Sequence, residues 1–354
     1  MFVPGPFCSA MLADLGAEVI KVEPPKGDPG RSYVPVQFRT ENRNKRSIAL
    51  DLKASASSAV VEKLVVKSQI VLEGFRPGVA KRLGIDYETL QQINPKIVYC
   101  SISGYGQTGP WRERPGHDVN YVAAAGGLAY PGQWLQAPAR SSLPVADMAG
   151  GSFAAIAILA ALHDGKGAYL DLSLFESAFF MAAMRHGLDP AVDPKAHIFP
   201  VNDVFECKDG KRLTLGILEQ HFWENFCKVV PGFDDEAFST DAKRRANGDR
   251  LSSFLRNIFL QKSAAQWTAL LEANDIPVDL CVSPAEASRA NRQLVERKAA
   301  TNGFATFPVF ANGRRGGELR SGTPGLGEHS REILVELGFD DADIAGLKKS
   351  GAVH

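Results

Sequence analysis

The stretch that decides the fold lies at the start of the chain and reads Gly5-Pro-Phe-Cys-Ser-Ala-Met-Leu-Ala-Asp-Leu-Gly-Ala-Glu-Val-Ile-Lys-Val-Glu23. Its first part, up to Leu15, has the apolar spacing of a helix, and Gly16 is a typical helix terminator. The residues from Glu18 to Val22 form a short apolar run of strand length. The stretch therefore predicts a helix followed by a strand, which is one step of an α/β repeat.

The same alternation continues through the first half of the chain. Further strands are predicted at 47–52, 69–73, 96–103 and 169–172, and further helices at 54–67, 87–93, 153–162 and from 175. Asp86 is the expected N-cap of the helix that begins at Tyr87. Repeated α/β alternation implies a parallel sheet covered by helices, with ligand sites where the strands give way to loops.

The pattern changes after residue 190. A hairpin is predicted at 204–207 and 212–215 around the turn Asp209-Gly210, and amphipathic helices follow at 220–230, 250–260 and 264–272. A Pro/Gly-rich segment at 321–327 precedes a last helix from Ser330. We therefore predict a large α/β domain over 1–190, a smaller α+β domain over 191–290, and a C-terminal part over 291–354.

Composition restricts the class of protein. The chain has 354 residues, with 40 Lys and Arg against 40 Asp and Glu, so no overall charge attracts nucleic acid or an anionic membrane. Its five cysteines lack a C-x-x-C pair, which argues against a zinc site and favours a reducing compartment. With no recognised targeting signal and no obvious membrane span, we expect a cytoplasmic protein without a membrane partner.

Gly104-Tyr-Gly106-Gln-Thr-Gly109 matches the dinucleotide-binding pattern G-x-G-x-x-G after a predicted strand. A dinucleotide site also needs a helix that begins at the glycines, whereas Pro110 and Pro115 interrupt the residues that follow. We therefore expect a flexible loop that lines a site, and no nicotinamide or flavin.

Two other segments carry side chains suited to acid and base chemistry. His117 follows a Pro-Gly turn in Pro115-Gly-His-Asp-Val-Asn-Tyr121, and Asp147 precedes a Gly-containing turn and the apolar helix. Alone, a loop histidine is more often a surface residue, and Asp147 would be an ordinary N-cap. The start of a helix can also stabilise an oxyanion beside a carboxylate.

Ordered matches along most of the chain resemble the CaiB/BaiF-type family III CoA-transferases. They are Gly5 to Glu23, Asn42 to Ile48, Glu73 to Gly78, Gly104 to Pro110, Pro144 to Asp147 and Pro324 to His329. This resemblance implies a Rossmann-like large domain built from both chain ends, a small middle domain, and an interlocked homodimer. Family members begin with a further strand before Gly5-Pro6, so we expect an incomplete sheet edge here.

The superfamily contains two chemistries. In its CoA-transferases the residue matching Asp147 is a covalent nucleophile, and in its racemases it is a proton-transfer base. Gly116 to Tyr121 resembles the racemase motif Gly-His-Asp-x-Asn-Tyr, and the segments 205–222 and 267–285 are also similar to racemases. The resemblance is therefore strongest to α-methylacyl-CoA racemase, with CoA transfer between carboxylic acids as the alternative and an inactive acyl-CoA-binding relative as a third reading.

Racemisation needs a base on one face of the α-carbon, an acid on the other, and donors to the enolate oxygen. We assign His117 and Asp147 as the two bases, and N–H groups at Asp147 and the following turn as the donors. Glu219 would hydrogen-bond to His117, although it could equally be a surface cap of the helix beginning at Gln220. Asp118 is expected to be structural.

The phosphates of CoA need clustered basic groups in a chain without net charge. Candidate contacts are Arg39, Arg43, Lys45, Arg46, Arg76, Arg82 and the loop residues Gly104, Tyr105 and Gly106. A solvated basic face is the alternative for the arginines. We expect no metal and no cofactor beyond the CoA that the substrate itself carries.

Overall fold

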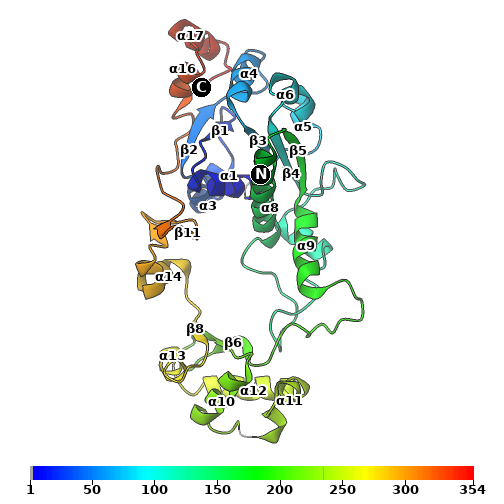
Figure 1. Ribbon diagram of the computed structural model, residues 1–354, viewed down its shortest axis with the longest axis vertical. Helices are drawn as coiled ribbons and strands as arrows, with labels where there is room; N and C mark the ends of the chain where they lie inside the picture. The colour runs from blue at the N-terminus through cyan, green and yellow to red at the C-terminus, as the bar shows by residue number, and fades with distance from the viewer. Residues whose placement is uncertain (1–2, 234) are drawn as a thin grey trace. The chain divides into compact units, whose positions relative to one another are not determined.

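The computed structural model describes residues 3–233 and 235–354 (Figure 1). The chain divides into two compact units, which we describe separately. Unit 1 contains residues 1–125, 142–181 and 292–354, and unit 2 contains 126–141 and 182–291. Unit 2 thus begins earlier than the expected residue 191 and also includes the segment 126–141.

Unit 1 contains the α/β repeats. Its elements are α1 (Pro4–Asp14), β1 (Val19–Glu23), α2 (Gly30–Tyr33), α3 (Pro35–Glu41), β2 (Lys45–Ala49), α4 (Ser57–Lys67), β3 (Ile70–Glu73), α5 (Val79–Arg82), α6 (Tyr87–Ile93), β4 (Val98–Ser103), α7 (Asp118–Ala124), α8 (Val145–Asp164), β5 (Ala168–Ser173), the first part of α9 (Leu174–His186), α15 (Arg292–Glu296), the short strands β9 (Ala300–Thr301), β10 (Phe304–Ala305), β11 (Phe310–Ala311) and β12 (Arg314–Arg315), α16 (Ser330–Glu336) and α17 (Asp341–Lys349). As expected, Asp86 caps α6, where its side chain accepts from the Thr89 N–H.

The five longer strands of unit 1 are parallel, but they form two sheets. β1 pairs with β2, and β4 lies between β3 and β5. The continuous sheet expected from the repeats is therefore interrupted, since the described residues place no strand between the two groups. β4 is buried at all six positions, as a central parallel strand requires.

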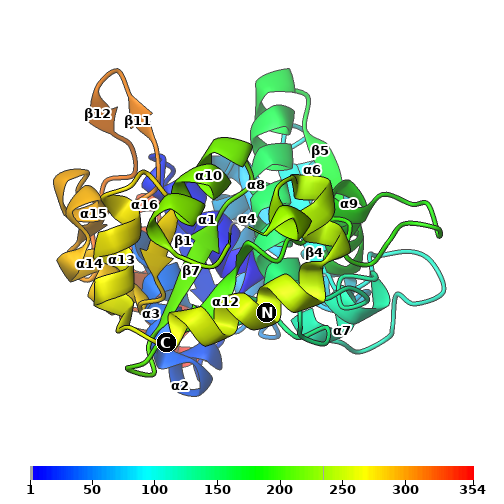
Figure 2. The same ribbon diagram turned by 90° about the horizontal axis from the view of Figure 1, so that it is seen from below.

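Helix α8 is the central helix of unit 1. It lies beside α1 in Figures 1 and 2, and a Cβ on Gly151 would stand only 2.7 Å from the Pro4 carbonyl oxygen. Only glycine permits this approach. Contrary to our reading of the sequence, α8 is long and apolar enough to cross a membrane by length and composition alone, and 33% of that stretch is buried. A core helix of a soluble protein passes the same test.

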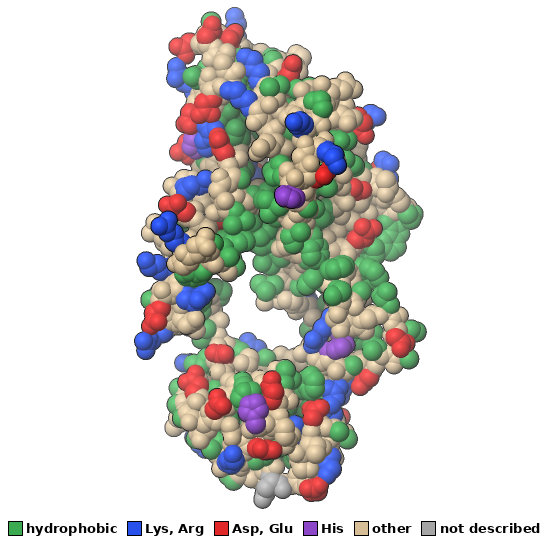
Figure 3. Space-filling model, in the orientation of Figure 1, with side chains coloured by type: hydrophobic (Ala, Val, Ile, Leu, Met, Phe, Trp, Pro, Cys, Tyr) green, Lys and Arg blue, Asp and Glu red, His purple; other side chains and the backbone are tan. Residues whose placement is uncertain are grey.

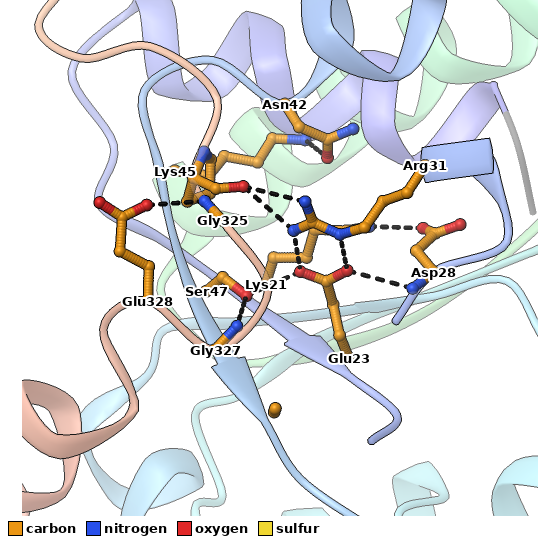
Figure 4. Close-up of polar contacts among 12 residues, drawn as sticks. Lys21, Glu23, Asp28, Arg31, Asn42, Lys45, Ser47, Gly325, Gly327 and Glu328 are labelled. Atoms are coloured by element: carbon orange, nitrogen blue, oxygen red, sulfur yellow. Dashed lines mark hydrogen bonds and ion pairs between the residues drawn. The ribbon is translucent and has the colours of Figure 1, made fainter. Parts of the chain in front are cut away.

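Residues near the two ends of the chain form one part of unit 1. Side chains of α16 and α17 pack with Ile48, Leu50 and Leu64 in one apolar core. Figure 4 shows the polar side of this junction: Glu23 holds Arg31, and Arg31 donates to the Pro324 carbonyl oxygen at 3.1 Å. The Gly327 N–H donates to Ser47 Oγ at 3.0 Å. The motif from Pro324 to His329 thus fastens the C-terminal part to β2.

Unit 2 is a small α+β unit. Its elements are the last part of α9, β6 (Asn202–Glu206), β7 (Arg212–Gly216), α10 (Gln220–Val229), the 3-10 helix η1 (Glu236–Phe238), α11 (Asp241–Ala246), α12 (Gly248–Phe259), α13 (Ala264–Glu272), β8 (Val278–Leu280) and α14 (Pro284–Ala290). β6 and β7 form the expected hairpin, and β8 adds an antiparallel third strand. Aromatic and aliphatic side chains of these elements make its core.

Candidate active site

Tyr121 joins two loops of unit 1. Its Oη donates to the Gly116 carbonyl oxygen at 2.5 Å, and its ring is so close that a Cβ on Gly104 would stand 2.5 Å from Oη. A Cβ on Gly116 would stand 2.7 Å from the same ring. Both glycines are therefore required by packing, and the loop after β4 is held against the segment that carries His117.

Asp118 connects α7 to the start of α8. Its buried carboxylate, 6% exposed, accepts from the Ala146 N–H at 2.7 Å and from the Asp147 N–H at 3.4 Å. Asp118 therefore caps α8 from outside that helix. Our expectation of a structural role for Asp118 agrees with these contacts.

The sequence placed Asp147 wrongly within its helix. α8 begins at Val145, so Asp147 is the third helical residue rather than the N-cap, and Gly150 and Gly151 lie inside the helix rather than in a turn. The Met148 N–H donates to the Pro144 carbonyl oxygen at 2.9 Å. Since the amides at 146–148 have internal acceptors, the predicted donors to an enolate oxygen at Asp147 are already occupied.

The environment of Asp147 favours its protonated form. Burial raises the pKa of the Asp147 carboxyl to about 7, and the negative charge of Asp118 acts in the same direction. The Asp147 charge in turn helps burial to raise the pKa of Tyr121. A carboxyl group with a pKa near neutrality can both accept and return a proton.

His117 differs from its neighbours in the motif. Gly116, Asp118 and Tyr121 have internal contacts, and Asn120 Oδ1 accepts from the His117 backbone N–H at 3.0 Å. The His117 residue itself is exposed, at the N-cap of α7. Because Asp118 bonds to the first turn of α8, the fold brings the backbone of the His117 segment to the backbone of Asp147.

Glu219 lies in unit 2, as the exposed N-cap residue of α10. Its side chain makes no capping hydrogen bond, so the alternative role as a side-chain cap has no support. The contact between Glu219 and His117 stays a prediction.

The predicted basic cluster at 39–46 is largely used inside unit 1. Lys45 is 3% exposed, and its Nζ donates to Asn42 Oδ1 at 3.0 Å (Figure 4). It also donates to the Pro6 carbonyl oxygen at 3.0 Å. Arg43 pairs with the buried Asp14 at 2.5 Å. Arg46 pairs with Glu18, Glu332 and Glu336. Burial removes Lys45 from any phosphate in this structure, and of the four side chains only Arg39 is exposed without such a pair among the described residues.

Arg76 and Arg82 follow the carboxyl end of β3, and both are exposed. The loop at 104–109 follows the neighbouring β4, and no helix begins at its glycines. Within this loop the Gln107 N–H donates to both carboxylate oxygens of Asp171, at 3.1 and 3.0 Å. Tyr105 is buried, and its Oη has no hydrogen-bond partner among the described residues.

From the sequence we assigned no role to Tyr121, the residue that holds the two loops together, although it is the last residue of the motif that begins at Gly116. No group of three His, Cys, Asp or Glu side chains that could hold a metal occurs in the part of the chain that the structure describes.

Comparison with known proteins places these features in a family. The model of "CoA-transferase family III" matches residues 1–330. The chain belongs to this family. A solved CAIB/BAIF family protein from Brucella suis has the same fold, with a TM-score of 0.82 and 28% identity over 95% of this chain and 96% of that one.

Family III relatives of this chain have different activities. An acyl-CoA transferase from Fusarium pseudograminearum (strain CS3096) is 33% identical, over 99% of this chain and 85% of the relative. The α-methylacyl-CoA racemase of Homo sapiens is 30% identical, over 99% of this chain and 94% of the relative. These similar identities show that the family of this chain includes both racemases and CoA-transferases. They do not show which of the two reactions this chain catalyses.

Proposed function

We propose that this family III protein racemises a 2-methylacyl-CoA thioester by moving the α-proton between His117 and Asp147. The observation that supports the proposal is that residues of the Gly116–Tyr121 segment differ in their contacts and exposure. Gly116, Asp118, Asn120 and Tyr121 make internal contacts, while the His117 residue is exposed. The neighbouring Asp118 accepts hydrogen bonds from the first turn of α8, the helix that carries Asp147.

In this reaction one base removes the α-proton, the C–H electron pair moves into the enolate, and the other group returns a proton to the opposite face. A pKa of about 7 suits Asp147 to both directions, because each protonation state is populated near neutral pH. Arg39, Arg76 and Arg82 are exposed and would contact the CoA phosphates. CoA enters as part of the substrate, and the proposed chemistry uses no metal or redox cofactor.

CoA transfer between carboxylic acids is the second candidate. It is favoured by the acyl-CoA transferase from Fusarium pseudograminearum (strain CS3096), which at 33% identity stands slightly above the human racemase at 30%. In that reaction the Asp147 carboxylate would attack the thioester carbonyl carbon, and CoA would leave as a thiolate.

A cytoplasmic homodimer is part of the proposal. Apolar side chains gather on the surface of unit 1 over α8 and α9 in Figure 3, and Ile156, Leu159, Phe179, Phe180 and Met181 are all exposed. Apolar surface of this kind is typical of a subunit interface. Sedimentation should give twice the mass of one chain.

Incubation with a 2-methylacyl-CoA in deuterated water separates the two reactions. We expect deuterium at the α-carbon without any added carboxylic acid. Transfer of CoA to an added carboxylate, without α-exchange, would replace the racemase proposal with the second candidate.

A further inference from the structure

A buried carboxyl group lies at the carboxyl end of β3. Glu73 is the last residue of this strand, is 9% exposed, and is the parallel partner of Ser101 on β4. Two loops leave this end of the sheet, residues 74–78 after β3 and residues 104–109 after β4. Ligands of open parallel sheets bind beyond the carboxyl ends of the strands. Burial of a carboxylate is costly unless donors surround it, so the partners of Glu73 indicate its use.

Glu73 holds the loop that follows its own strand. Its Oε2 accepts from the Phe75 N–H at 2.6 Å. Phe75 precedes Arg76, one of the exposed arginines expected to contact the CoA phosphates. The hydrogen bond therefore fixes the backbone at the start of the 74–78 loop.

The other oxygen of Glu73 is linked to the second loop through Ser101. Ser101, which is 1% exposed, donates its hydroxyl to Glu73 Oε1 and accepts from Gln107 Nε2 at 2.7 Å. On the opposite neighbour of β4, Asp171 of β5 accepts from the Gln107 N–H. Side chains of β3, β4 and β5 thus hold the 104–109 loop together.

The 104–109 loop is also joined to the segment that carries His117. Its first residue, Gly104, lies so close to Tyr121 that a Cβ there would stand 2.5 Å from Oη. The same Oη donates to the carbonyl oxygen of Gly116, the residue before His117. A chain of contacts therefore runs from Glu73 to the backbone beside the proposed base.

The hydrogen bonds to Glu73 run in one direction. The Phe75 N–H and the Ser101 hydroxyl both donate, and an ionised carboxylate accepts from both. Burial raises the pKa of Glu73, while the bonds from Ser101 and Phe75 lower it and the charge of Asp171 raises it. Glutamine has nearly the same shape but only one acceptor oxygen, so its NH₂ group would face one of the two donors.

We propose that Glu73 is a positioning residue that holds the 74–78 and 104–109 loops in the arrangement that binds the CoA part of the substrate. The inference rests on the proposed function for the CoA contacts of these loops. Loops that are ordered before binding lose no further freedom when the ligand binds, which increases affinity. Glu73 acts through Phe75 and Ser101, and it has no assigned contact with substrate.

The test compares Glu73→Gln with Ser101→Ala, and the probe is CoA itself, titrated by calorimetry. Glu73→Gln disturbs both loops, and we expect the dissociation constant to rise about tenfold. Ser101→Ala breaks only the link to Gln107, and the rise should be smaller, about threefold. Because the two side chains act in one chain of contacts, the double variant should bind about as weakly as Glu73→Gln. Independent effects would instead multiply to about thirtyfold.

A control variant and a measurement of loop mobility complete the test. Glu62 is exposed on α4, and Glu62→Gln should leave the dissociation constant unchanged. Amide hydrogen exchange without ligand should be faster in both loops of Glu73→Gln. In Ser101→Ala it should be faster only in the 104–109 loop, with the Phe75 amide still protected, and this variant decides the case if Glu73→Gln fails to fold. A merely structural role would lower the free energy of unfolding without changing the affinity for CoA.

Three results would overturn the inference: wild-type affinity for CoA in Glu73→Gln and Ser101→Ala, effects that multiply in the double variant, or a wild-type protein that binds no CoA. A wild-type protein that binds CoA but catalyses no α-exchange would instead count against the proposed racemase. The CoA affinities of the variants would then still decide the role of Glu73.

Discussion

Two segments of unit 1 were predicted from sequence to carry function, and the structure treats them differently. In the Gly116–Tyr121 segment the internal contacts leave the His117 residue exposed. In the Arg39–Arg46 segment the internal contacts use the basic side chains themselves, and Arg39 is the exposed exception. The comparison separates residues that a segment uses for internal contacts from residues that it leaves exposed, and only the exposed ones are within reach of a ligand in solution.

The largest effect should come from His117→Ala. Loss of a general base typically slows proton transfer by about 100-fold to 10,000-fold, and we expect a loss of α-exchange in that range. Thermal stability should stay unchanged, because the residue is exposed. His163→Ala, at an exposed position near the end of α8, is the matched control. Wild-type exchange rates in His117→Ala would remove the imidazole from the mechanism.

Arg43→Ala should mainly reduce stability. It leaves the carboxylate of Asp14, whose side chain is 2% exposed, with Asn44 as its remaining side-chain partner. Removing one member of a buried pair costs about 3 kcal/mol, which urea unfolding should detect as a lower free energy of unfolding. If stability were unchanged but CoA affinity fell, Arg43 would be a ligand residue and the contrast between the segments would fail.

Arg39→Ala should reduce the affinity for CoA and leave stability unchanged, in contrast to Arg43→Ala. We expect a decrease in CoA affinity of about tenfold, measured by calorimetry, since a charge-assisted contact to phosphate contributes about 1.5 kcal/mol or more. The free energy of unfolding should not change. Equal CoA affinity in wild type and variant would leave Arg39 as a solvated surface residue.

The smallest effect concerns the cap of α8. Asp118→Ala should lower the free energy of unfolding by about 1 kcal/mol, the usual contribution of an N-cap side chain. Asp118→Asn retains an acceptor oxygen and should recover most of that stability. If alanine and asparagine behaved alike, the hydrogen bonds to Ala146 and Asp147 would not be what holds the two helices.

The sequence predicted local structure better than partnerships between distant segments. α6 with its Asp86 cap, the hairpin of β6 and β7, and the helix α13 all follow from nearby residues, and their predicted bounds agree closely with the structure. The position of Asp147 in its helix was misjudged because α8 begins at Val145 and is capped at Ala146 by Asp118, which lies 28 positions before Ala146.

The second error concerned the exposure of basic side chains. Lys45 and Arg43 read as surface residues because basic side chains are mostly exposed, yet Asn42, Pro6 and Asp14 provide internal partners for them. No pattern in the sequence indicated that Glu41 would be buried as well.

The hydrogen bond from Arg31 to the Pro324 carbonyl oxygen joins residues 293 positions apart, and Val353 pairs with Leu50, the residue after β2. A growing polypeptide leaves the ribosome from its N-terminus, so β1 and β2 emerge long before the residues that cover them. Unit 2 has all its residues by position 291 and can pack its core sooner. During synthesis, the part of the protein that begins first is therefore expected to finish last.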